Sequence, residues 1–227
     1  MVILEDKEIE KALFENCEEV IVPIEVTKRD KKVEIITLEK TKDIANEFEK
    51  RFIKSPFSKE AKMFLHSSLN DVVKAWGYQG NDIDEGHILT YVDKEVNQSL
   101  ILPTTKRIKG KGKYENLTEH ELEKIPRNSN ECYFVTIIDN KIVSVCEMNT
   151  AGAFIGATEI NVYTAPHYRK NGYGASNVCA MANYLINQGK RVAYTVNYKN
   201  KPSEKLAIKC GFEKLAETFY YITYREE

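Results

Sequence analysis

The stretch YTAPHYRKNGYGASNV, residues 163–178, joins a strand-like run to a helix-like run. Within it, Arg169, Gly172 and Gly174 have the spacing R-x-x-G-x-G. A helix that begins after such a turn presents backbone N–H groups without partners in the helix, and its positive dipole end favours an anion. Glycine is needed where an anion approaches the backbone closely or where φ is positive. The stretch therefore predicts a pyrophosphate-binding turn, with an ordinary glycine-rich turn as the alternative.

A second motif lies downstream, where NKPSEKLAIKCGF, residues 200–212, has the pattern N-x-x-S-x-x-L-x-x-x-x-G-F. Together with P-x-Y-R-x-x-G-x-G from Pro166, it resembles the GNAT superfamily of acyl-CoA-dependent N-acyltransferases. The resemblance covers roughly residues 130–227 and implies a mixed α/β, GNAT-type fold in the C-terminal half. It also implies acetyl-CoA as the acyl donor and a small primary amine or amino-acid-like acceptor.

The resemblance assigns donor-binding roles mainly to backbone groups. The amides from Arg169 to Ser176 would hold the pyrophosphate of coenzyme A, and Val162 and Thr164 would pair with its pantetheine arm. Asn200 would flank that arm. The implied donor-binding residues are Val162, Tyr163, Thr164, Arg169, Lys170, Asn171, Gly172, Tyr173, Gly174, Ala175, Ser176, Asn200 and Ser203.

Two carboxylates are candidates for the catalytic base. Acyl transfer to an amine requires that an ammonium group lose a proton, directly or through water. Glu159 is the first candidate, because it precedes the predicted phosphate turn on the same strand, and Glu147 is the second. Strand alternation places Glu159, Asn161 and Tyr163 on one face. The alternative for both glutamates is a solvated strand carboxylate.

The general acid departs from the family pattern. Many members place a tyrosine directly after the leucine that corresponds to Leu206, whereas this chain has Ala207. Substitutes to consider are Tyr198, Ser203, Cys210, Tyr220 and Tyr221. The departure also admits a second class of function, a regulatory or interaction module that binds acyl-CoA with little or no turnover.

Another fold alternative, a dinucleotide-binding oxidoreductase, lacks its sequence signature. The segment GYGASN, residues 172–177, has no third glycine, and the next strand ends in VNY without an acidic residue.

The composition argues against several classes of protein. The 227 residues carry a net charge of -1 with 30% charged residues, so no partner nucleic acid or membrane surface is predicted. No apolar run is long enough to span a bilayer, and the acidic N-terminal segment predicts neither signal nor transit peptide. The five cysteines are scattered singly, which predicts reduced thiols, a cytoplasmic location and no metal site. The cysteines expected in the core are Cys132, Cys146, Cys179 and Cys210.

The C-terminal half predicts alternating strands and helices. Strands are expected at 132–138, 142–148, 158–164, 191–198, 212–216 and 219–224, and helices at 175–188 and 202–210. We also consider a homodimer, because the two closing strands could leave an exposed edge.

The first half predicts a separate, smaller α/β domain through about residue 100, followed by the acyltransferase domain at 101–227. Helices are expected at 7–19, 41–52 and 58–76, and strands at 20–26, 32–38, 87–92 and 99–102. A short helix should end near 125, and KRIKGKGKY at 106–114 should form a solvated loop.

Overall fold

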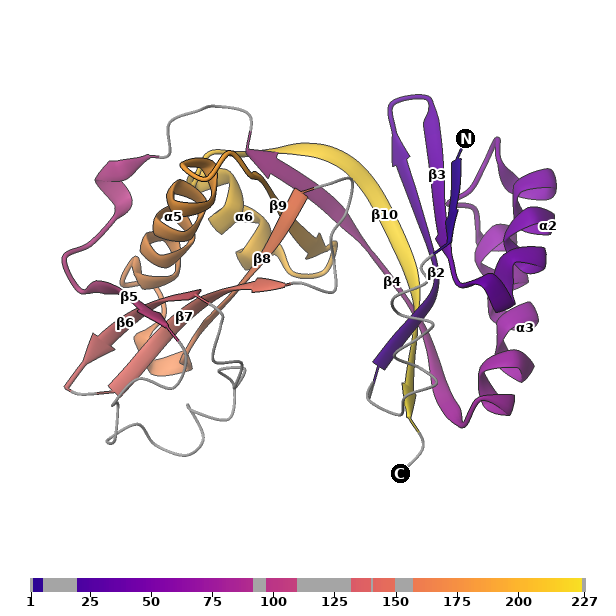
Figure 1. The fold of residues 1–227 in the computed structure, drawn as a ribbon, viewed down its shortest axis with the longest axis horizontal. Coiled ribbons are helices and arrows are strands. Elements are labelled where there is room, and N and C mark those ends of the chain that lie inside the picture. Colours follow the sequence, from indigo (N-terminus) through magenta and orange to yellow (C-terminus); the bar gives the residue numbers. More distant parts are fainter. Residues whose placement is uncertain are drawn as a thin grey trace. The chain divides into compact units, whose positions relative to one another are not determined.

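The computed structural model, shown in Figure 1, divides into two compact units. It describes residues 2–5, 20–91, 97–109, 132–139, 141–149 and 157–225. The first unit comprises Met1–His87 and Ala216–Glu227, and the second comprises Ile88–Leu215. Strands β4 (Tyr78–Tyr91) and β10 (Phe212–Arg225) contribute residues to both units. Whether residues 1–100 form a separate domain stays a prediction.

The first unit is a sheet covered by two helices. Its strands β1 (Val2–Glu5), β2 (Val20–Arg29) and β3 (Lys32–Thr37) have the order β1-β3-β2-β10. Helices α2 (Lys42–Phe52) and α3 (Lys59–Ala75) lie on one side of these strands (Figure 1). The α3 helix begins after Ser58, whose Oγ accepts a hydrogen bond from the Ala61 N–H at 3.2 Å. The Phe48 ring of α2 packs 6.2 Å from that of Phe219 and anchors α2 on β10.

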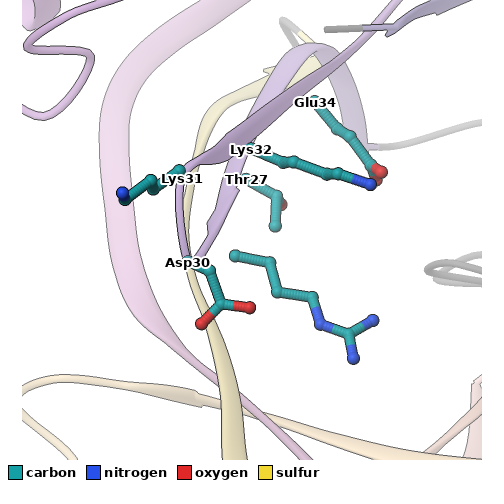
Figure 2. Close-up of a pocket in the computed structure, with 6 residues that line it drawn as sticks. Thr27, Asp30, Lys31, Lys32 and Glu34 are labelled. Atoms are coloured by element: carbon teal, nitrogen blue, oxygen red, sulfur yellow. The ribbon is translucent and has the colours of Figure 1, made fainter.

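The opposite face of this sheet is polar near the β2–β3 turn. A hollow there is lined by Thr27, Arg29, Asp30, Lys31, Lys32 and Glu34. Figure 2 shows Lys31 pointing away from the side on which Lys32 and Glu34 extend. Thr27 is 2% exposed, and its Oγ1 donates to Thr218 Oγ1 at 3.0 Å. These residues have no part in the predicted phosphate turn, so we treat the hollow as a separate feature.

The second unit holds every motif of the predicted site. Its strands are β5 (Thr105–Lys109), β6 (Cys132–Ile138), β7 (Lys141–Asn149), β8 (Ala157–Thr164) and β9 (Arg191–Asn197). They run in the order β9-β8-β7-β6-β5, with β8 and β9 parallel and the other neighbours antiparallel. Helix α5 (Tyr173–Ile186) connects β8 to β9, and α6 (Lys201–Lys209) follows β9. Val178, Met181, Ala182 and Leu185 of α5 are buried in the core.

Most predicted elements are confirmed, including the central strand–helix–strand unit. The four cysteines expected in the core are buried. The predicted break between 216 and 219 is wrong, because β10 runs unbroken through the buried Thr218. The strand predicted at 87–92 belongs to the longer β4. The helices predicted at 7–19 and near 125 lie outside the described residues.

Two predictions near residue 100 are also wrong. Residues 98–100 form a short 3-10 helix instead of a strand, because Ser99 Oγ donates to Asn97 Oδ1 at 2.6 Å and turns the chain. The predicted loop at 106–114 begins as strand β5, which pairs with β6 and buries Ile108. The alternation of Ile108 with charged neighbours is typical of an edge strand. Residues 110–114 lie outside the described part.

Candidate functional site

Helix α5 begins without a side-chain cap. Gly172 occupies the N-cap position with φ 83° and ψ -5°, and no side chain accepts from the first turn. The Ser176 N–H donates to the Gly172 carbonyl at 2.9 Å, which is the first bond of the helical ladder. The N–H groups of Tyr173, Gly174 and Ala175 precede that bond and have no acceptor within the helix. The first turn of α5 can therefore bind an anion through backbone N–H donors alone.

The two motif glycines serve different purposes. Gly172 adopts a left-handed conformation that other residues rarely adopt, although a Cβ there would have room, with its nearest neighbour at 3.8 Å. Gly174 is limited by space, because a Cβ would lie 3.1 Å from both Thr164 Oγ1 and Leu206 Cδ1. Gly174 thus allows α5 to approach both β8 and α6 closely. The sequence predicted the glycines but not this division of purpose.

Side chains of the turn stabilise its backbone. Arg169 Nε donates to the Thr164 carbonyl at 3.0 Å, and Asn171 Nδ2 donates to the Tyr168 carbonyl at 3.2 Å. Lys170 has φ 67°, so the turn contains two left-handed residues, Lys170 and Gly172. Arg169, Lys170 and Asn171 are exposed. The turn is therefore held in shape by its own hydrogen bonds, while its three polar side chains face solvent.

Strands β8 and β9 pair only at their beginnings. The register joins Ala157 to Arg191 and ends where Glu159 meets Ala193. Beyond that point β8 continues to Thr164 with β7 as its partner. Val162 and Thr164, two of the predicted donor-binding residues, lie in this part of β8, directly before the phosphate turn. Within the part of the chain that the structure describes, the pairing of β8 with β9 ends at Glu159, and this edge of β8 leads toward the start of α5.

The two candidate carboxylates lie on the same face of the sheet. Ile160 and Val162 pack in the core against α5, so Glu159, Asn161 and Tyr163 lie on the opposite face, as the alternation predicted. Glu147 on β7 is paired with Asn161 and shares this face. Glu159 is 9% exposed and Glu147 is half-buried. The structure therefore brings both glutamates to one patch on neighbouring strands, away from the face on which α5 packs.

Asn200 and Ser203 lie together at the start of α6. The Asn200 Oδ1 atom accepts a hydrogen bond from the Ser203 N–H at 3.2 Å and caps the helix. Ser203 Oγ lies 2.7 Å from the hydroxyl of Tyr194 on β9. Burial raises the pKa of Tyr194 to about 12, while the hydrogen bond with Ser203 acts in the opposite direction. Tyr194 was not among the predicted site residues, although the alternation Val192-Tyr194-Val196 places it on the α6 side.

The residues considered as general acids differ in their surroundings. Ala207 is completely buried in the core shared by α5, α6 and β9. Cys210 is buried too. The pKa of its thiol is raised, mainly by the hydrogen bond with the Cys179 thiol and to a smaller extent by burial. Tyr221 is completely buried in the first unit, which also contains Tyr220. Among these candidates Ser203 lies one helical turn before Ala207, on the same side of α6.

In the residues that the structure describes, no group of three or more histidine, cysteine or acidic side chains is arranged to hold a metal ion. Within the same ranges, none of the helices combines the length and apolar character that a bilayer crossing requires.

Comparisons with known proteins identify the segment that contains these features. Residues 139–221 match the family model described as FR47-like protein, which is related to the GNAT superfamily. The matched segment begins at the β6–β7 turn and includes the predicted phosphate turn, both glutamates and α6. No curated protein matches the chain.

Solved structures with similar folds include several GNAT proteins. A GNAT-family acetyltransferase from Novosphingobium aromaticivorans is 14% identical, with a TM-score of 0.49 over 66% of this chain and 69% of that one. A GCN5-related N-acetyltransferase-like protein from Streptococcus suis is 17% identical, with a TM-score of 0.46 over 67% and 66%. An aminoglycoside N-acetyltransferase, AAC(6')-Iy in complex with CoA, is 16% identical, with a TM-score of 0.37 over 49% and 92%.

Proposed function

We propose that the protein is an N-acetyltransferase that transfers the acetyl group of acetyl-CoA to a primary amine of a small, amino-acid-like acceptor. The observation that carries the proposal is the uncapped start of α5 after Gly172, at the end of a strand whose pairing with β9 ends at Glu159. An anion at the helix start and an extended chain along β8 would occupy neighbouring places. Coenzyme A joins a pyrophosphate to an extended pantetheine arm in that order.

The residues of the turn fit the donor. The N–H groups of Tyr173, Gly174 and Ala175 would donate to the pyrophosphate, and the exposed Arg169 and Lys170 would add positive charge beside it. Backbone groups on the β9 edge of β8, including Val162, would pair with the pantetheine arm. The Thr164 carbonyl already accepts from Arg169, so Thr164 would contribute its N–H or its remaining lone pair.

The chemistry requires an unprotonated amine at the end of the same edge. When bound, acetyl-CoA supplies a thioester carbonyl that such an amine can attack. Glu159 is our first candidate for the base, and Glu147 on the neighbouring strand is the second. Glu159 is preferred because it lies on β8, the strand that leads directly into the predicted phosphate turn. Ser203, backed by Tyr194, would replace the tyrosine that many GNAT proteins have at the position of Ala207.

Calorimetric titration with acetyl-CoA and a thiol-release assay on a panel of amines test the proposal in sequence. We expect one donor site per chain and coenzyme A release that depends on an amine. Glu159→Gln should lower kcat by about a hundredfold or more and leave the donor Kd unchanged. Glu147→Gln on the same face compares the two candidates directly, and a larger loss of kcat there would assign the role of base to Glu147. Donor binding without release on any amine would replace this proposal with a binding module.

The cytoplasmic location stays a proposal that rests on the scattered cysteines. The reason given for a homodimer is wrong, because the closing strand β10 lies between β2 and β4 and leaves no exposed edge. The homodimer itself stays a proposal. Sedimentation of the purified protein at two concentrations would test it.

A further inference from the structure

Three hydroxyl and amide groups connect the start of α5 to a segment more than seventy residues earlier. Ser176 is completely buried, and its Oγ accepts a hydrogen bond from the Leu102 N–H at 2.8 Å. The same Oγ lies within hydrogen-bonding distance of Thr105 Oγ1. Leu102 Cδ1 is also the atom that a Cβ added at Gly172, the left-handed residue of the predicted phosphate turn, would meet first, at 3.8 Å. Leu102, Thr105 and Ser176 therefore form one contact, which we call the hydroxyl latch.

The donors and acceptors of the latch can be assigned. Thr105 Oγ1 lies 3.1 Å from Asn177 Oδ1, which only accepts, so Thr105 donates there. The proton between the two hydroxyls must then come from Ser176, which donates to Thr105 and accepts from Leu102. Thr136 on β6 donates to the same Asn177 oxygen at 3.1 Å without contacting Ser176. The hydroxyls of Ser176 and Thr105 thus each accept one hydrogen bond and donate one, in a chain that runs from the Leu102 N–H to the Asn177 Oδ1 atom.

The latch fixes the turn of helix that would hold the pyrophosphate. Ser176 is the residue whose N–H makes the first bond of α5, to the Gly172 carbonyl. Its side chain is held by Leu102 and Thr105, so the segment around them determines where the amides of the first turn point. Leu102 and Thr105 are also bonded to each other, because the Thr105 N–H donates to the Leu102 carbonyl at 3.0 Å. A shift of this segment would move the anion donors directly.

We propose that Thr105 and Ser176 are positioning residues for the donor site, and that the segment from Leu102 to Thr105 belongs to the donor-binding machinery. This inference rests on the proposed function of the α5 turn. The Ser176 side chain would act only through its buried hydrogen bonds to Leu102 and Thr105, whereas its backbone would face the donor. Binding of the donor and placement of the 102–105 segment are linked, because each stabilises the same first turn.

Calorimetric titration of coenzyme A into the full chain tests the latch with a matched pair of variants. Thr105→Val removes the hydroxyl between Ser176 and Asn177, whereas Thr136→Val removes a second, fully buried donor to Asn177 that is not hydrogen-bonded to Ser176. Both variants should lower thermal stability. Only Thr105→Val should raise the Kd for coenzyme A, by about three- to tenfold. Thr105→Ser keeps the hydroxyl and should restore the Kd.

A second readout separates positioning from general loosening. Ser176→Ala should raise the Kd as Thr105→Val does, and the increase in the double variant should be smaller than the two single effects combined, because both changes remove the hydrogen bond between Ser176 and Thr105. These variants also keep the test usable if Thr105→Val does not fold. Equal Kd values for Thr105→Val, Thr136→Val and the unmodified protein would overturn the latch and leave the proposed function intact. Failure of the unmodified, folded protein to bind coenzyme A would overturn the proposed function and the latch with it.

Discussion

Replacing Gly172 by alanine tests the central claim about the phosphate turn. The residue has φ 83°, and a left-handed conformation costs a non-glycine residue roughly 1–2 kcal/mol. An added Cβ would meet only Leu102 Cδ1, at the ordinary contact distance of 3.8 Å. The change therefore adds conformational strain without a clash. The free energy of unfolding should fall by at most about 1–2 kcal/mol, because any rotation of the turn relieves part of this strain.

Gly189 offers a matched control beyond the other end of the same helix. It has φ 73°, and nothing lies within 4 Å of the position that a Cβ would take. Gly189→Ala should thus cause a similar loss of unfolding free energy, measured by urea denaturation. Only Gly172→Ala should affect the anion donors, because relief of its strain would rotate the N–H groups of Tyr173 and Gly174.

The expected effect on donor affinity follows from the hydrogen bonds at stake. A hydrogen bond to a charged group contributes about 1.5–3 kcal/mol, so the loss of one raises the Kd for coenzyme A by about tenfold or more. Calorimetry on the two variants and the unmodified protein measures this directly. Gly172→Asn should retain more affinity than Gly172→Ala, because asparagine tolerates the left-handed region better. An equal Kd for Gly172→Ala and Gly189→Ala would refute the assignment of the turn.

Three further predictions concern α6 and its contacts. Asn200→Ala should lower the free energy of unfolding by about 1 kcal/mol through loss of the cap, whereas Asn200→Asp should keep stability. Calorimetry on Asn200→Asp then measures any separate role in donor binding. An unchanged Kd for coenzyme A would limit Asn200 to capping. The raised pKa of Tyr194 means that the unfolded state ionises first, so stability should fall as pH rises from about 10 to 12. Tyr194→Phe should remove that part of the pH dependence, and parallel denaturation profiles would contradict it. Ala207→Tyr should not restore a general acid, because Ala207 is completely buried. Overpacking should instead lower the free energy of unfolding by about 1–3 kcal/mol. A variant with a higher kcat and unchanged stability would show that the site has room.

The part of the site that lies close together in sequence could be predicted from it. The spacing of Arg169, Gly172 and Gly174 located the turn, and the alternation of Glu159, Asn161 and Tyr163 assigned their common face. Both inferences depend on local geometry, which a short stretch of residues determines. The place of Asn200 at the start of α6 was likewise predicted, although its bond to the Ser203 amide shows a capping role beside the predicted one.

Contacts between distant residues could not be predicted in the same way. The bond between Thr105 and Ser176 joins two elements of which one was expected to be a loop. The closeness of Gly174 to Leu206 depends on how α5 and α6 pack, which no local pattern encodes. Two closing strands were expected at 212–216 and 219–224, yet the strand continues through Thr218, whose hydrogen-bond partner Thr27 comes from the first strands of the chain. In each case tertiary packing overrides the local signal.

The last strand also has a consequence for the order in which the protein is made. Strand β10 pairs with β2, and the bond between Thr27 and Thr218 spans 191 positions of the chain. During synthesis the first unit must therefore wait, with one edge of β2 unpaired, until the ribosome has released residues of the final strand. Closing so long a loop is slow, so folding of the first unit should follow that of β6, β7, β8 and α5, which are neighbours in sequence. Exposed β2 would be the segment most in need of a chaperone in the meantime.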